Sequence, residues 1–191
     1  MDEIVGQTVY FARPGPGNTG RALLLARERA LALGITPVIV ATTSGEAALE
    51  AARVFGNDGP RLVAVSHSAG FKAPDTRELL PEHRQALAEA GVPVLTTTHA
   101  FGGIGRAVRR RFNTYQVDEI IAHTLKVMGE GAKVACEVTL MAADAGLVRT
   151  DEDAIALGGT GSGLDTALVL KPANAQDFFA LRIREIICKP R

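Results

Sequence analysis

Short apolar runs alternate with helix-like segments along the first two-thirds of the chain, and no other feature limits the fold as strongly. Four such runs are predicted to be strands, at residues 8–11, 37–41, 61–66 and 92–96. Helical patterns follow the first three, over about 18–33, 46–55 and 81–90. Two more helical patterns, at 104–111 and 116–128, precede a fifth apolar run, 133–140, which is also predicted to be a strand.

The predicted strands are apolar throughout rather than at every second residue. Continuous apolar runs are typical of strands that are covered on both faces. Alternation of strand and helix also implies crossover connections between parallel strands. The sequence therefore predicts an α/β fold of three layers, α/β/α, around a mainly parallel sheet.

The last third of the chain changes character. Apolar runs at 153–157 and 166–170 flank a glycine-rich segment, 158–163, without room for a helix, so an antiparallel hairpin is expected. Residues 182–188 mix charged side chains with isoleucine and are predicted to be a closing strand at an edge of the sheet. Neither a linker nor a repeat divides the sequence, so one domain is expected over residues 1–191.

Composition excludes several functions. Twenty-one Lys and Arg balance twenty-one Asp and Glu, so the chain lacks the positive field that binds nucleic acid or an anionic membrane. It also lacks an apolar stretch long enough to span a bilayer, and its acidic start, Met1–Glu3, is unlike a signal peptide. A cytoplasmic protein with buried, reduced Cys136 and Cys188 is expected, although a disulfide between them stays open. Homo-oligomer formation also stays open.

Ligands of open parallel sheets bind at the carboxyl ends of the strands. In this sequence those ends are rich in hydroxyl groups, glycine and histidine, which offer hydrogen-bond donors and close approach to the backbone. The candidate binding residues are Asn18, Thr19, Thr42, Thr43, Ser44, Gly45, Glu46, Ala47, Ser66, His67, Gly70, Phe71, His99, Gly102 and Gly103.

The turn at residues 42–47 is the most specific of these features. It ends a buried strand and opens a helix, whose first N–H groups attract anions such as phosphate. A side chain at Gly45 is expected to block the approach of an anion to the backbone. An ordinary N-cap by Ser44 or Thr43 would explain the same residues, and both interpretations stay open.

His67 and His99 each follow a strand end, and Phe71 and Phe101 come shortly afterwards. Around a cleft these rings can flank a flat heterocycle, or one histidine can do acid–base chemistry near neutral pH. The alternative is that each histidine bonds a loop carbonyl. No metal is expected, because 32 residues separate the two histidines and a third ligand at a suitable spacing is missing.

Glu137 is a further candidate because it lies inside an apolar run. A carboxylate there must be paired, protonated or open to a cleft. Strand alternation would put Glu137 on the same side as Thr139 and Met141. A ligand contact predicts that Glu137→Gln costs little folding stability, whereas a buried ion pair predicts a large loss.

Two other motifs are given structural interpretations. The spacing within Gly158–Gly163 does not fit a dinucleotide fingerprint, and a strand follows, so a hairpin tip or flap is expected. The basic cluster of Arg106, Arg109, Arg110 and Arg111 is expected to be a solvated helix face. The alternative for the arginines is a contact to a ligand phosphate or to a partner subunit.

Residues 38–48, Val-Ile-Val-Ala-Thr-Thr-Ser-Gly-Glu-Ala-Ala, resemble the strand, turn and helix of the pyruvate kinase C-terminal domain, whose T-x-S-G-x-[ST]-A turn holds an effector phosphate. Stand-alone proteins of that fold are similar over nearly the full length, in residues 9–11, 14–15, 18–19, 137–146 and 185–191. The resemblance implies that fold and FMN as the bound cofactor. This sequence departs from the family's pattern at Ala47, which lacks the hydroxyl, and at Glu46, which adds a carboxylate.

These features predict a small protein that binds a phosphorylated flat ligand, most simply FMN, at the carboxyl ends of the strands. Pyruvate kinase activity is not implied. The alternatives are a flavin-dependent oxidoreductase, a hydrolase or isomerase acting on a small phosphorylated metabolite, and a regulatory subunit that responds to a sugar phosphate. The sequence contains no recognisable set of nucleophile and base, so no catalytic residue is predicted.

Overall fold

The computed structural model describes residues 3–56 and 58–191. Met1 and Asp2 of the predicted N-terminal segment, and Asn57 of the loop after the second helix, lie outside the described residues. In the part that is described, seven strands form one sheet: β1 (Val9–Phe11), β2 (Val38–Ala41), β3 (Leu62–Ser66), β4 (Val94–Thr96), β5 (Ala154–Gly158), β6 (Thr166–Lys171) and β7 (Arg182–Pro190).

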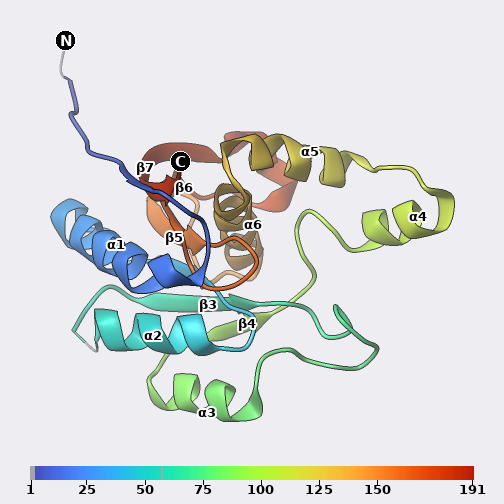
Figure 1. The fold of residues 1–191 in the computed structure, drawn as a ribbon, viewed down its shortest axis with the longest axis horizontal. Coiled ribbons are helices and arrows are strands. Elements are labelled where there is room, and N and C mark those ends of the chain that lie inside the picture. The colour runs from blue at the N-terminus through green and yellow to red at the C-terminus, as the bar shows by residue number, and fades with distance from the viewer. Residues whose placement is uncertain (1–2, 57) are drawn as a thin grey trace.

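The strands follow the order β1-β7-β6-β5-β2-β3-β4 across the sheet (Figure 1). Pairs β1–β7, β2–β5, β2–β3 and β3–β4 are parallel, whereas β6 is antiparallel to both of its neighbours. The predicted mainly parallel sheet with an antiparallel hairpin near the C-terminus is therefore confirmed. So is the α/β class.

Helices cover both faces of the sheet. On one face α1 (Thr19–Leu33), α2 (Glu46–Phe55) and α3 (Pro81–Glu89) enclose a core with side chains such as Leu23, Phe55 and Ile155. On the other face α6 (Glu130–Asp144) packs on the sheet around Ile39 and Leu168, with α5 (Val117–Leu125) outside it. Three short 3₁₀ turns, η1 (Pro16–Asn18), η2 (Lys126–Met128) and η3 (Ala175–Ala180), complete the layers.

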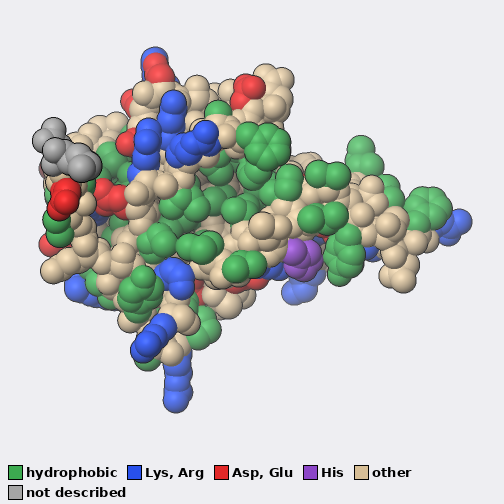
Figure 2. Space-filling view, turned by 90° about the horizontal axis from the view of Figure 1, so that it is seen from above, with side chains coloured by type: hydrophobic (Ala, Val, Ile, Leu, Met, Phe, Trp, Pro, Cys, Tyr) green, Lys and Arg blue, Asp and Glu red, His purple; other side chains and the backbone are tan. Residues whose placement is uncertain are grey.

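Helix α4 (Ile104–Phe112) protrudes from the body of the molecule (Figure 1). None of the residues of α4 is buried, and the side chains of Ile104 and Phe112 are largely exposed. Figure 2 shows hydrophobic side chains on the surface of this protrusion. None of the helices in the described residues has the length and apolar character needed to cross a membrane.

Residues 133–140, predicted to be a strand, instead form the middle of α6. The prediction was wrong because this helix is buried nearly all round, with eleven of its fifteen residues shielded from solvent. A helix without a polar face shows no 3.6-residue period, so its sequence cannot be told from that of a buried strand. Close packing confirms the burial: a side-chain carbon on Gly158 of β5 would lie 2.3 Å from the carbonyl oxygen of Gly131.

Strand β7 does not lie at the edge of the sheet, as had been predicted, because β1 pairs with it on its outer side. That pairing joins Val9 to Cys188 and ends at Pro190. The charged residues that suggested an edge lie earlier in the strand, before the part that β1 covers. There Glu185 accepts two hydrogen bonds from Arg29 of α1, each 2.7 Å long.

The order in which the chain places strands across the sheet changes direction at β2. From β2 it proceeds to β3 and β4, then returns through α6 to place β5 on the opposite side of β2. Such a switch point leaves a crevice at the carboxyl ends of the strands, between the helices that leave in opposite directions. The candidate residues after β2, β3 and β4 lie at that end of the sheet.

Candidate functional site

A cleft of about 480 Å³ opens at the carboxyl ends of β2, β3 and β5. One wall is the turn between β2 and α2, with Thr42, Thr43 and Ser44. The opposite wall is the face of α6 that carries Lys133 and Glu137. The glycine-rich loop after β5 and the histidines after β3 and β4 close its remaining sides.

In the turn between β2 and α2, called the α2 turn below, and in the first turn of α2, some backbone N–H groups have a side-chain acceptor and others have none. Thr42 Oγ1 accepts a hydrogen bond from the Gly45 N–H at 3.1 Å, and Ser44 Oγ accepts one from the Glu46 N–H at 3.4 Å. The next two amides, of Ala47 and Ala48, have no acceptor in the described part of the chain, as expected within a first helical turn. Ala47 lines the cleft whereas Ala48 is buried, so an anion at this end of α2 would find the Ala47 amide as a donor.

Gly45 is itself the N-cap of α2, in place of the predicted Ser44 or Thr43, and its φ of 104° lies in the left-handed region. A side-chain carbon added to Gly45 would lie 2.5 Å from His83 Cβ and 2.9 Å from Leu79 Cδ1. These atoms belong to α3 and the loop before it, behind the turn. The expectation that a side chain at Gly45 would block the cleft is therefore wrong, because it would instead collide with α3.

Three rings meet at the ends of β3 and β4. The rings of Phe71 and His99 are stacked, 4.8 Å apart at an angle of 14°. The His67 ring lies 4.4 Å from Phe71 and 5.1 Å from His99. Phe101 is separate from this cluster: it is buried against Phe178 and lines neither hollow of this region.

The two histidines have carboxylate neighbours rather than the loop carbonyls considered above. His67 Nδ1 lies 2.7 Å from Glu78 Oε2, and His99 Nδ1 lies 3.7 Å from Glu137 Oε2. Burial lowers the pKa of His99 to about 4, and the smaller effect of the Glu137 carboxylate opposes that change. His99 is consequently neutral at physiological pH, with a stacked ring that carries no charge.

Glu137 is 4% exposed and fully engaged. Its Oε1 accepts the N–H of Phe101 at 3.0 Å, and its Oε2 accepts a hydrogen bond from Lys133 Nζ at 2.5 Å. The predicted strand alternation is wrong here, because on a helix Glu137 shares a face with Lys133 and Met141. Thr139 bonds the carbonyl of Ala135 elsewhere in the helix. Glu137 thus lines the cleft and is also half of a buried ion pair.

Most of the predicted residues come together in this cleft. Its lining includes Thr19, Thr42, Thr43, Ser44, Glu46, Ala47, Ser66, His67, Phe71, His99 and Glu137. Gly70 and Gly103 line a neighbouring hollow, which shares Phe71, His99 and Arg106 with the cleft. Asn18, Gly45 and Gly102 line neither hollow; the Asn18 side chain bonds the carbonyls of Arg13 and Gly15.

Several lining residues were not predicted. Lys126, Glu130 and Lys133 enter the cleft from η2 and α6. The spacing of four between Lys126 and Glu130, and between Lys133 and Glu137, is a helical ion-pair signal that could have located this wall.

The C-terminal end of the glycine-rich loop is anchored to the start of α1 and to the turn before it. The N–H of Leu164 donates to Thr19 Oγ1 at 2.9 Å, and the N–H of Gly15 donates to the buried carboxylate of Asp165 at 3.0 Å. A side chain on Gly163 would lie 2.5 Å from Pro16 Cα. The loop therefore forms a close-packed wall of the cleft.

The described residues contain no cluster of three or more His, Cys, Asp or Glu side chains that could hold a metal ion. Both cysteines are buried as free thiols, and burial raises the pKa of each to about 12. They do not belong to the cleft.

Comparison with known proteins gives structural neighbours. No protein-family model matches the sequence. Two solved structures of pyruvate kinase from Cryptosporidium parvum, one of them in complex with ADP, are similar with a TM-score of 0.41, at 15% and 16% identity over 81% of this chain. A third has a TM-score of 0.40 at 14% identity over 84%.

The chain spans only 23–24% of the length of these pyruvate kinases. Likeness this low assigns neither a ligand nor an activity to the chain.

Proposed function

We propose that the chain binds a small phosphorylated molecule with a flat ring system, and that FMN is the first ligand to test. One observation carries the proposal: a single cleft joins the open amide of Ala47 in the α2 turn to the stacked rings of Phe71 and His99. Its volume of about 480 Å³ lies within the range of roughly 300–1,000 Å³ that is usual for cofactor sites.

The phosphate group would lie at the α2 turn. There the amide of Ala47 has no backbone acceptor in the described residues, and the helix dipole favours a negative charge. The Thr43 hydroxyl lines the cleft without a protein partner in the described residues. The exposed carboxylate of Glu46 opposes an anion at the same place, so binding would depend on the Ala47 amide and Thr43.

The ring system would lie toward Phe71 and His99. A neutral, stacked imidazole and a phenyl ring present flat apolar surface, which suits a heterocycle better than a sugar. The Lys133 ammonium, held by Glu137 on the facing wall, offers a donor to heteroatoms at the edge of such a ring. Recognition by shape and by hydrogen bonds would then both come from side chains already in place.

The test is an FMN titration followed by quenching of flavin fluorescence, together with the absorbance spectrum of the purified protein. We expect saturable binding near one equivalent, weakened at least threefold by Thr43→Val, which removes one hydroxyl and keeps the shape. The matched control is Thr124→Val, which removes a hydroxyl from exposed α5. Protein that neither carries nor takes up flavin would refute FMN, and saturable binding of a sugar phosphate in the same assay would support the regulatory alternative.

A second candidate function is acid–base catalysis on the bound molecule. The observation in its favour is the neutral His99, 3.7 Å from the Glu137 carboxylate in the same cleft. A neutral imidazole can accept a proton from a substrate. Burial weakens His99 as a base, and the adjacent Glu137 carboxylate counteracts this because it stabilises the imidazolium that forms. Turnover of a small phosphorylated metabolite that is abolished by His99→Gln, with binding retained, would support an enzyme; unchanged turnover in that variant would exclude His99 as its base.

A further inference from the structure

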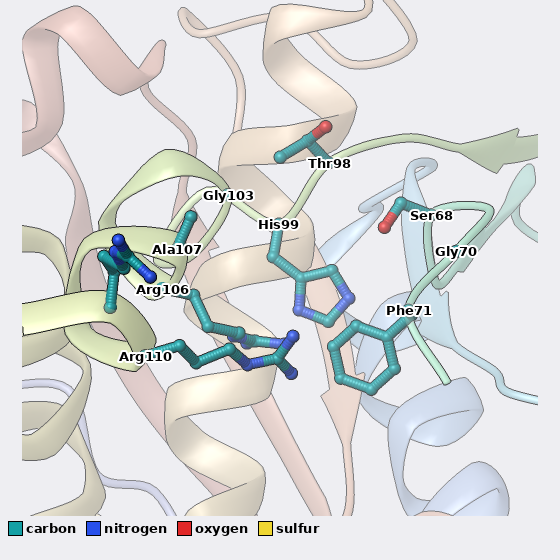
Figure 3. Close-up of a pocket in the computed structure, with 10 residues that line it drawn as sticks. Ser68, Gly70, Phe71, Thr98, His99, Gly103, Arg106, Ala107 and Arg110 are labelled. Carbon is teal, nitrogen blue, oxygen red and sulfur yellow. The ribbon is translucent and has the colours of Figure 1, made fainter. Parts of the chain in front are cut away.

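Helix α4 directs three of its four arginines toward one hollow. This hollow, about 480 Å³ in volume, lies beside the cleft and is lined by Arg106, Arg110 and Arg111 together with Ser68, Phe71 and His99. Figure 3 shows the side chains of Arg106 and Arg110 extending from α4 toward Phe71 and His99. The fourth arginine, Arg109, faces away and bonds Glu119 of α5 at 2.6 Å.

These three guanidinium groups lack a carboxylate partner in the described part of the chain. Arg106 and Arg110 are four residues apart, so their like charges lie on the same face of the helix and repel each other. Arg109, by contrast, forms an ion pair because Glu119 of α5 lies within its reach. The unpaired face concentrates positive charge on a neutral protein, at a hollow rather than on a convex surface.

Arg106 is held in place before any ligand binds. Its guanidinium lies 4.8 Å from the centroid of the Phe71 ring. On another side it approaches the backbone of Gly102, where a side-chain carbon would lie 3.3 Å from Arg106 Nη2. The stack on Phe71 and the close approach to the Gly102 backbone restrict the conformations of the Arg106 side chain. Ligand binding would therefore cost little of its conformational entropy.

We infer that Arg106, Arg110 and Arg111 form an anion-binding subsite, which takes the phosphate or carboxylate group of a second small molecule. Planar guanidinium groups bind both oxyanions in a bidentate manner. The subsite shares Phe71, His99 and Arg106 with the cleft, whereas Arg110 and Arg111 line the hollow and not the cleft, so its ligand would lie against the ring system of the first one. It does not require a ligand at the α2 turn, and it therefore goes beyond the proposed function.

The test is an NMR titration of ¹⁵N-labelled protein that follows the Nε–Hε signals of the arginines and the amides of Gly70 and Gly103. Inorganic pyrophosphate and malonate serve as separate probes for the two oxyanions. We expect saturable shifts of these signals, with the tighter probe identifying the preferred group. Arg110→Gln should raise the dissociation constant at least fivefold, and the double variant Arg106→Gln/Arg110→Gln should abolish saturation.

The matched control is Arg53→Gln, which removes the same charge from an exposed position at the end of α2. It should change the dissociation constant less than twofold. Equal weakening by Arg53→Gln would reduce the effect to net charge and overturn the subsite. So would shifts confined to Ala47 and Ala48, or the absence of saturation with both probes. Failure of FMN to bind leaves these signals untouched, so the two proposals fail separately.

Discussion

Replacement of Glu137 by glutamine tests whether the ion pair in α6 holds the fold together. The substitution keeps the shape and an oxygen that accepts the N–H of Phe101, but it leaves the Lys133 ammonium without its counter-charge. The Lys133 side chain is only 12% exposed. Loss of one partner from a buried pair typically costs about 3–5 kcal/mol, and we expect a value of about 3, because Lys133 opens on the cleft and water can reach it.

Equilibrium unfolding in urea measures this loss directly. With a dependence of about 2 kcal/mol per molar urea, a loss of about 3 kcal/mol lowers the midpoint by roughly 1.5 M. The matched control is Glu130→Gln on the same helix, since Glu130 pairs with Lys126 at the same spacing, at 3.0 Å, but both side chains are at least 35% exposed. Exposed pairs contribute about 0–1 kcal/mol, so the control should hardly move.

A third variant separates charge from packing. If the loss comes from the uncompensated ammonium, Lys133→Gln/Glu137→Gln should recover much of the stability, because no buried charge remains. A midpoint for Glu137→Gln equal to that of Glu130→Gln would refute the reasoning. It would mean that the pair is solvated in solution and that Glu137 is free to serve a ligand alone.

Three further outcomes are expected. The pKa of His99 is 6.5 in the unfolded chain and about 4 in the folded protein. The free energy of unfolding should therefore be highest above pH 6.5 and should fall by about 3 kcal/mol as the pH is lowered toward 4. In urea unfolding across that range, His99→Gln should flatten this pH dependence and His123→Gln should not. Gly45→Val should lower the thermal midpoint sharply through its collision with α3, and a variant as stable as the original would contradict the φ of 104°. Glu46→Gln should tighten FMN binding two- to fivefold by removing a like charge, whereas equal affinity in the flavin titration would place the phosphate elsewhere.

Much of the sheet could be predicted because its apolar runs end at glycine, proline or hydroxyl residues. The hairpin of β5 and β6 followed from the lack of room for a helix between them. Two errors have physical causes. Residues 135–140 are all buried, which erases helical periodicity. Strand β7 gains its outer neighbour from a segment some 180 residues away, a pairing that local patterns do not encode.

The site could be predicted in part for the same reasons. Residues after the strand ends converge because parallel strands bring their carboxyl ends to one edge, which placed Thr43, Phe71 and His99 correctly. The α6 wall was missed because its residues were assigned to a strand. The effect of a substitution at Gly45 depends on the φ of that residue and on the packing of α3 against it. Neither can be read from the residue type.

The pairing of β1 with β7 also constrains when the sheet can be completed during synthesis. Val9 leaves the ribosome early, but its partner Cys188 is made 179 residues later, which at about 5–20 residues per second takes roughly 10–40 s. Throughout that interval β1 has no strand to pair with, whereas β2 and β3 can pair as soon as both have emerged. Strand β1 is therefore among the last strands to be incorporated into this sheet, although it precedes the other six along the chain.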